Sequence, residues 1–354
     1  PQTGRYKDQG LQQRLGAFLA VDEINAAGGV LGRPLELVIR NSRSDPERGA
    51  RNTAEMIDRD GVRMVFGGVS SAVAIASGKA ARDRGILYFG TLTYANATTG
   101  AEGHRYMFRE PYNAWMTAKV LSQYLTRHHA DDTYFYITAD YTWGWSVEDS
   151  VRRFSGTEDS QRHPGVRTPF PRALVSDFRH ALEQAQASGA KVLMLVLFGD
   201  DMVRALTVAH DMGLTETMQI VVPNLTLGMA RQVGPTIMSG VVGAAPWFWN
   251  LPYEKGYPRG KAFVEAFSQR YDMRPSSSAA STLTSRRPSP MKLKQNSVSI
   301  MVRAGKISVQ GAISMSRAPF EIRLPSEVSG SCTPRPRKLR KLSARITTGM
   351  VSVT

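Results

Sequence analysis

An almost unbroken apolar run at residues 192–198 narrows the possible folds of this chain more than any other stretch. A strand with one face in solvent alternates apolar and polar side chains, whereas a strand covered on both faces of a parallel sheet is apolar throughout. The run therefore predicts a central strand of a parallel sheet. Consecutive parallel strands need long crossover connections, which are usually helices.

Helix-like and strand-like segments alternate over the first 280 residues, as such a sheet requires. Residues 11–27 have apolar side chains at helical spacing, and Gly28 and Gly29 end that pattern. Asp45 and Pro46 are the residue types favoured at the N-cap and first position of a helix. Helices are further predicted at 71–84, 114–128, 143–154, 177–187 and 259–271, and strands at 35–39, 62–66, 86–89, 134–138 and 241–245, with helix, strand and helix between 199 and 227. The alternation predicts an α/β protein.

The character of the chain changes near Ser276. Residues 276–290 are crowded with Ser, Thr, Arg and Pro, and no regular period continues for long after them. The formal net charge is +15, yet the stretch from Ser281 to the end holds 14 Lys/Arg and only 2 Asp/Glu. We interpret residues 281–354 as a basic tail of low order, which a shifted reading frame would explain. The alternative is an arm that binds nucleic acid or an acidic partner.

Several classes of protein find no support in the sequence. No apolar run approaches the length of a membrane-spanning helix, and the single cysteine, Cys332, allows no internal disulfide. Neither a glycine-rich dinucleotide motif nor a P-loop occurs, and the six histidines show no metal-ligand spacing. Ala72 replaces the second glycine of a nucleophile elbow at 68–72. We therefore expect no enzyme, no metal site and no cofactor.

Motifs at five places resemble the branched-chain amino acid and amide binding proteins of ABC importers. They are VDEINAAGGVLGR at 21–33, Asp-Pro at 45–46, VFGGVSSA at 65–72, TADYTWG at 138–144 and VVPN at 221–224. The similarity covers residues 4–280. It implies the type I periplasmic-binding-protein fold, in which two doubly wound parallel-sheet lobes are joined by a hinge.

The resemblance also implies where the lobes divide. Residues 1–112 and 247–280 should form lobe 1 and residues 113–246 lobe 2, with crossings near 108–111 and 243–247. The first strand of lobe 1 should precede Thr3-Gly4, and the closing elements should follow Ser281. Because neither is recognisable, we expect the chain to be an incomplete copy.

The best-defined site residues are Ser70 and Ser71, which follow a predicted strand and open a predicted helix. A helix N-terminus presents free N–H groups and the positive end of its dipole, so it suits a carboxylate or carbonyl oxygen. Ligands of open α/β sheets bind beyond the carboxyl ends of the strands, which is where these serines lie. The alternative is that both hydroxyls only cap the helix.

By resemblance, further contacts come from other strand ends. Leu92, Thr93 and Tyr94 should supply a backbone acceptor and a hydroxyl, with an ordinary loop as the alternative. Trp143 should cover the ligand from lobe 2 with a flat indole that carries one donor, although a packed core tryptophan is the alternative. The remaining predicted contacts in lobe 2 are Phe198, Gly199 and Asn224.

Asn224 departs from the family pattern, because amino-acid binders commonly place a carboxylate there. An amide has no formal charge, and burying an ammonium without a carboxylate is costly. The solute is therefore expected to be an amide, a urea-like compound or another neutral or acidic molecule. Asp200 or Asp201 could still supply a charge.

The sequence thus predicts the substrate-binding component of an ABC importer, which captures a small polar solute by hinge closure and presents it to a membrane permease. We expect a monomer in the periplasm or a lipid-anchored extracytoplasmic protein, with no nucleic-acid partner. A cytosolic amide sensor of the same fold is the alternative, followed by a basic nucleic-acid binder. The aromatic residues Trp247, Phe248, Trp249, Tyr253 and Tyr257 should pack at the second crossing.

Overall fold

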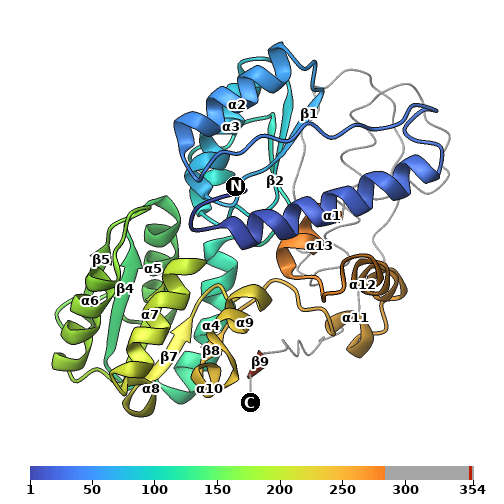
Figure 1. Ribbon diagram of the computed structural model, residues 1–354. Coiled ribbons are helices and arrows are strands. Elements are labelled where there is room, and N and C mark those ends of the chain that lie inside the picture. The colour runs from blue at the N-terminus through green and yellow to red at the C-terminus, as the bar shows by residue number, and fades with distance from the viewer. Residues whose placement is uncertain (284–350, 353–354) are drawn as a thin grey trace, which may run out of the picture.

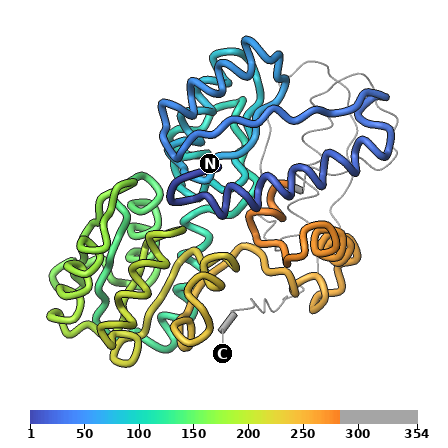
Figure 2. The backbone as a smooth tube through the Cα atoms, viewed as in Figure 1, coloured from blue at the N-terminus to red at the C-terminus, as the bar shows by residue number. Residues whose placement is uncertain are grey.

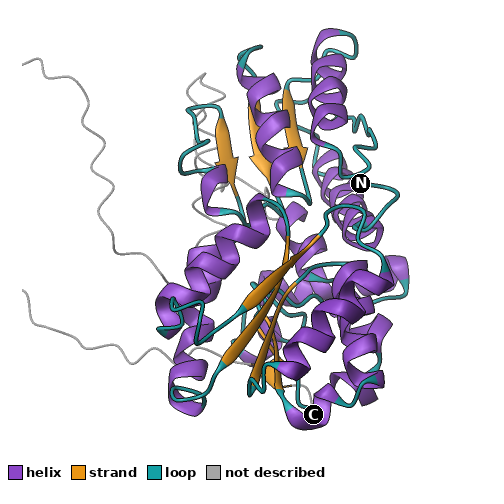
Figure 3. Ribbon diagram, turned by 90° about the vertical axis from the view of Figure 1, so that its left-hand side faces the viewer, coloured by secondary structure: helices purple, strands orange, loops and turns teal. Residues whose placement is uncertain are grey.

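The computed structural model describes residues 1–283 and 351–352 and contains two β-sheets (Figure 1). One sheet has the strand order β1-β2-β3, and the other has the order β5-β4-β6-β7-β8-β9. Figure 3 shows the two sets of strands apart from each other, with helices alongside both. Within the described residues, no helix is both long and apolar enough to cross a membrane.

The first sheet is parallel and short, with β1 (Met64–Gly67), β2 (Leu87–Gly90) and β3 (Met107–Arg109) in sequential order. Val65, Tyr88 and Met107 are buried on one of its faces, together with Ala74 of α3. The helices of this region are α1 (Lys7–Ala26), α2 (Pro46–Asp58) and α3 (Ser71–Arg82). Asp45 caps α2 as predicted, because its carboxylate accepts a hydrogen bond of 2.6 Å from the Arg48 backbone N–H.

The second sheet contains the predicted central strand, which is confirmed as β6 (Val192–Val196) and is buried along its whole length. It pairs in parallel with β4 (Tyr134–Ala139) on one side and β7 (Gln219–Val222) on the other. Its other strands are β5 (Gly165–Thr168), β8 (Val242–Gly243) and β9 (Val351–Ser352). The helices of this region are α4 (Ala114–His128), α5 (Thr142–Ser155), α6 (Val175–Ala187), α7 (Asp200–Asp211), α8 (Leu214–Thr217), α9 (Leu227–Val233) and α10 (Pro235–Met238).

After β8 the chain returns towards α1 through α11 (Leu251–Glu254), α12 (Pro258–Tyr271) and α13 (Ser277–Leu283). The tube in Figure 2 shows α13 beside α1. The two helices approach closely because Gly16 has no side chain: a Cβ there would lie 2.4 Å from the Ala279 carbonyl oxygen. The Thr282 hydroxyl also donates to the Gln13 carbonyl oxygen over 3.1 Å. The contact shows that regular structure continues past Ser281, where the sequence predicted a tail.

Two further expectations are corrected by the structure. The predicted strand at 35–39 is absent, because no described strand lies beside it to complete a ladder. The Asn25 side chain instead satisfies Leu35, accepting from its N–H over 2.7 Å and donating to its carbonyl over 2.9 Å. The second sheet is also not wholly parallel, since β9 pairs with β8 in the antiparallel direction. The rest of the predicted tail, 284–350 and 353–354, lies outside the described residues.

The main hydrophobic core joins both regions of the molecule. It is centred on the second sheet, yet it also contains residues that follow β1 and β2 and one that precedes α1. These are Tyr6, Val69, Leu92, Tyr94 and Ala95. The loops beyond the first sheet are therefore buried by the second sheet, which places the strand ends of both sheets against each other.

Candidate functional site

The nine predicted ligand contacts all follow strands, and parallel strands end at the same edge of a sheet. Ser70 and Ser71 follow β1, and the stretch 92–94 follows β2. On the second sheet, Trp143, Phe198, Gly199 and Asn224 follow β4, β6 and β7. All of the nine that have a side chain are buried, and the contacts below bring several of them together.

The two serines have different roles, which the sequence could not separate. Ser70 is the N-cap residue of α3, but its side chain makes no capping hydrogen bond. Its hydroxyl is 1% exposed and has no partner among the described residues. Ser71 instead accepts a hydrogen bond of 3.1 Å from the Ala95 backbone N–H, which fixes the loop after β2. Of the two serines, Ser70 is thus the one whose hydroxyl has no hydrogen-bond partner among the described residues.

The three predicted residues in the loop after β2 are all buried and packed against other parts of the chain. Leu92 is buried in the main core, and the Thr93 hydroxyl lies 2.6 Å from that of Thr98. Tyr94 stacks on Tyr112, with ring centroids 4.9 Å apart and ring planes 8° from parallel. Thr93 therefore has a partner within its own loop, whereas Tyr94 points its ring into the cluster described next.

Aromatic rings from separate segments meet around Phe198. Its ring centroid lies 5.4 Å from Tyr6, 5.8 Å from Trp143 and 6.2 Å from Tyr94. The Trp143 indole is buried, and its N–H has no acceptor among the described residues. We call this group the aromatic cluster, and it comprises Tyr6, Tyr94, Tyr141, Trp143, Phe170 and Phe198.

Three members of the aromatic cluster were missed by sequence reasoning. The Tyr6 and Tyr141 hydroxyls lie 2.8 Å apart, and Tyr141 stacks on Phe170 at 4.0 Å. Burial raises the pKa of Tyr6 well above its usual value, so the phenol stays neutral. Tyr6 lies in a Gly-Arg-Tyr segment before α1, where no strand pattern marks it.

Asn224 is the amide of the site, and only one of its two polar side-chain atoms has a hydrogen-bond partner among the described residues. Its nitrogen donates to the Tyr112 hydroxyl, whereas its oxygen is buried with no partner among the described residues. The Tyr112 ring in turn stacks on the ring of Tyr94. Asn224 therefore supports the aromatic cluster through one atom and offers a neutral acceptor through the other.

Asp201 is the buried acid of the site, and it is already paired. Its carboxylate lies 3.1 Å from the Arg5 guanidinium, which also donates to the carbonyls of Pro171 and Ala173. Burial raises the pKa of Asp201 to about 6, and Arg5 opposes that change only in part. The backbone N–H of Asp200 donates to the Arg5 carbonyl oxygen over 3.2 Å.

Gly199 marks the point where the segment before α1 meets the second sheet. Its φ of +63° lies in the region that favours glycine. A Cβ at this position would lie 2.6 Å from the Arg5 carbonyl oxygen and 2.7 Å from the Tyr6 ring. Gly199 thus permits the approach of the segment from which Arg5 and Tyr6 project into the site.

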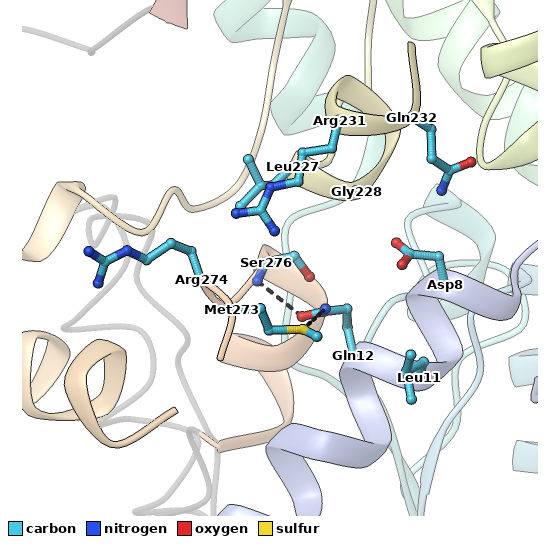
Figure 4. A pocket seen from close by; sticks show the side chains of 10 residues that line it. All are labelled: Asp8, Leu11, Gln12, Leu227, Gly228, Arg231, Gln232, Met273, Arg274 and Ser276. Carbon is cyan, nitrogen blue, oxygen red and sulfur yellow. Dashed lines mark hydrogen bonds between the residues drawn. The ribbon is translucent and has the colours of Figure 1, made fainter. Parts of the chain in front are cut away.

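A cavity of about 190 Å³ lies between α1, α9 and the segment before α13. Figure 4 shows the Asp8 carboxylate beside the Gln232 amide, with the Arg231 guanidinium reaching towards Ser276. Burial raises the pKa of Asp8 above its usual value. None of the nine predicted residues lines this cavity. It combines an acid, two arginines and amides.

The aromatic residues of the second crossing do not join the aromatic cluster. Trp247 and Trp249 pack against a separate core that includes Phe263 of α12, and Tyr253 and Tyr257 are exposed. Among the described residues there is also no group of three or more His, Cys, Asp or Glu side chains placed to hold a metal ion.

Comparison with known proteins gives consistent matches. A family model described as periplasmic binding protein matches residues 1–285. The leucine-, isoleucine-, valine-, threonine- and alanine-binding protein of Pseudomonas aeruginosa is 29% identical over 277 residues, which are 76% of this chain and 69% of the relative. A periplasmic binding protein from Burkholderia mallei superposes with a TM-score of 0.72 at 24% identity, covering 88% of this chain and 76% of that one. A solute-binding protein from Rhodopseudomonas palustris in complex with 3,4-dihydroxybenzoic acid superposes with a TM-score of 0.69 at 16% identity, covering 80% and 75%.

Proposed function

Because this chain belongs to the periplasmic binding protein family, whose model matches residues 1–285, we propose that it captures a small polar solute at the aromatic cluster. Members of the family bind small-molecule solutes and work with the permeases of ABC importers, and this chain is the substrate-binding component of such an importer. The family implies an extracytoplasmic location. A monomer in the periplasm or on a lipid anchor is part of our proposal.

The observation that carries the site assignment is a set of buried polar atoms with no partners among the described residues, contributed from both sheets. They are the Ser70 hydroxyl after β1, the Trp143 indole N–H after β4 and the Asn224 amide oxygen after β7. Buried polar groups are almost always hydrogen-bonded in native proteins, and one left unsatisfied costs free energy. A solute with polar groups of its own would satisfy them, and the aromatic cluster would hold its apolar part.

The arrangement supports binding by hinge closure. We assign residues 1–112 and 247–280 to one lobe and residues 113–246 to the other. Tyr6 and Tyr94 then meet Phe198 across the division. A solute that touches both lobes binds the closed form more tightly than the open form, and that difference in affinity drives closure. The permease would recognise the closed form.

The test is calorimetry on the full chain with a panel of amino acids, amides, urea and aromatic acids. The panel includes leucine, after the Pseudomonas aeruginosa relative, and 3,4-dihydroxybenzoate, after the Rhodopseudomonas palustris protein. Trp143→Ala and Ser70→Ala should each weaken binding of the active solute by about tenfold or more, and Ser71→Ala together with Trp143→Ala should abolish it. The matched control is Trp145→Ala, which removes a 44% exposed tryptophan two residues along the same helix. Unchanged affinity in the site variants would overturn the assignment.

A further inference from the structure

The segment before α1 carries one side chain that reaches across the division between the lobes. Resting on the proposed function and its lobe assignment, we propose that Arg5 is a latch that stabilises the closed arrangement of lobe 1 (1–112 and 247–280) and lobe 2 (113–246). Arg5 is a positioning residue, because its guanidinium binds groups of lobe 2 and thereby acts on closure of the cleft.

The segment itself is attached to lobe 1 at both of its ends. At its start, the Asn41 amide nitrogen donates to the Thr3 hydroxyl over 3.0 Å. At its end, α1 is tied to the loop after β2, because the Gln13 amide donates to the Thr91 hydroxyl over 2.6 Å. Arg5 lies between these two attachments. When the lobes move apart, Arg5 therefore moves with lobe 1.

The guanidinium of Arg5 faces oxygen atoms of lobe 2. Its Nη1 lies 3.1 Å from the Asp201 carboxylate of α7. Its Nε donates to the Pro171 carbonyl oxygen over 3.3 Å, and its Nη2 donates to the Ala173 carbonyl oxygen. An arginine presents its donors in a planar, permanently charged fork, which a lysine ammonium does not reproduce. One side chain of lobe 1 thus holds two separate segments of lobe 2, the loop after β5 and the start of α7.

Burial makes this ion pair sensitive to opening of the cleft. The Asp201 side chain is 3% exposed and that of Arg5 is 16% exposed. A buried charge that loses its partner is strongly destabilising, whereas a charge in water is hydrated. Opening the cleft separates the two groups and exposes both to water. Loss of the guanidinium therefore destabilises the closed form and not the open form, which shifts the equilibrium between them.

Two measurements on the full chain without solute test the latch. The backbone N–H of Asp200 donates to the Arg5 carbonyl oxygen over 3.2 Å, so its hydrogen exchange, measured by NMR, reports contact of the segment with lobe 2. Small-angle X-ray scattering reports separation of the lobes as a larger radius of gyration. At a pH where Asp201 is ionised, Arg5→Ala should speed exchange at Asp200 about tenfold or more and increase the radius of gyration.

The matched control is a second arginine that binds one carboxylate and two backbone carbonyls, all inside lobe 2. It is Arg152 of α5, and its partners are Glu148, Thr157 and His163. Arg152→Ala should lower the unfolding free energy and change neither the exchange at Asp200 nor the radius of gyration.

A double variant separates a latch from a residue that only keeps its own segment folded. Adding Asp201→Asn to Arg5→Ala should bring the radius of gyration part of the way back, because it removes the buried charge that Arg5→Ala leaves without a partner. A purely local role of Arg5 would give no such rescue. Arg5→Lys keeps the charge but not the fork, so it should give an intermediate radius of gyration.

An unchanged radius of gyration in Arg5→Ala, or an equal increase in Arg152→Ala, would overturn the latch. If Arg5→Ala does not fold, Arg5→Lys decides the question, and a radius of gyration equal to that of the unmodified chain would then overturn it. These measurements need no solute, whereas the proposed function is tested by calorimetry with the solute panel. Failure of the latch and failure of the proposed function are therefore distinguishable.

Discussion

The two sheets of this molecule differ in how they are buried. β6 in the second sheet is completely enclosed. The first sheet has one covered face, which includes Val65 and Tyr88, whereas Met64 and Phe108 on its strands are each 39% exposed. The loops beyond the first sheet are nevertheless buried, because they pack into the core of the second. The second sheet is thus the scaffold of the site, and the residues that the first sheet contributes to the site are buried against it.

The largest expected effect on the unfolding free energy comes from removing a phenylalanine side chain beside each sheet in turn. Phe178 of α6 is fully buried in the main core, whereas Phe89 of β2 is half-buried and stacks on Phe108 at 5.1 Å. Phe178→Ala should cost about 3–5 kcal/mol of unfolding free energy, as for other buried phenylalanines. Phe89→Ala should cost about 1 kcal/mol, because less of its surface leaves water. Urea denaturation followed by circular dichroism measures both.

An equal loss in the two variants would break the comparison, since it would mean that the first sheet is as tightly enclosed as the second. Trp145→Ala, which removes an exposed ring, gives the baseline for an aromatic side chain outside the core. Its unfolding free energy should change by about 0.5 kcal/mol or less.

The next effect concerns the buried pair that joins the segment before α1 to α7. Asp201 has a pKa of about 6, raised from 3.8 by burial. A carboxyl whose pKa is raised on folding contributes stability that is complete below its unfolded pKa and is lost as the pH rises through its folded pKa. A tenfold change in the acid dissociation constant corresponds to about 1.4 kcal/mol. The contribution of Asp201 to the unfolding free energy of the unmodified chain should therefore decrease as the pH rises from about 4 to about 6.

Asp201→Asn should remove that contribution, and urea denaturation at several pH values across this range and above it measures the difference. The ion pair with Arg5 exists only where Asp201 is ionised, so the informative quantity is the change in the slope of unfolding free energy against pH. Asp8, another acid whose pKa burial raises, keeps its own slope in both proteins and cancels in the comparison. Parallel pH profiles would show that Asp201 does not couple the two regions.

The contrast between the sheets also explains what the sequence could predict. The apolar run of β6 and the helix at 114–128 depend on local pattern, and both are found where predicted. The prediction of a strand at 35–39 was wrong because a strand exists only beside a partner, which no local pattern supplies. Tyr6 was missed for the same reason, since its role depends on contacts with Phe198 and Tyr141 far along the chain. Likewise, Ser71 has a hydrogen-bond partner and Ser70 has none among the described residues because of the position of a loop 24 residues away from Ser71.

The smallest expected effect compares two helix caps, one beside each sheet. Asp45 accepts from the backbone N–H of Arg48 at the start of α2, which packs on α3 beside the first sheet. Asn113 accepts from the backbone N–H of Met116 at the start of α4, on the side of the second sheet. Replacing either with alanine should cost about 1 kcal/mol, the usual value of a cap.

Amide hydrogen exchange then shows which strands lose protection when each cap is removed. If the second sheet is the scaffold, Asp45→Ala should speed exchange in β1 and β2 and leave β4 and β6 protected, because local opening of the first sheet does not require the second to open. Asn113→Ala should speed exchange in both sheets, since the first sheet loses its support when the scaffold opens. Faster exchange confined to β4 and β6 in the Asn113 variant would show that the first sheet stands without that support.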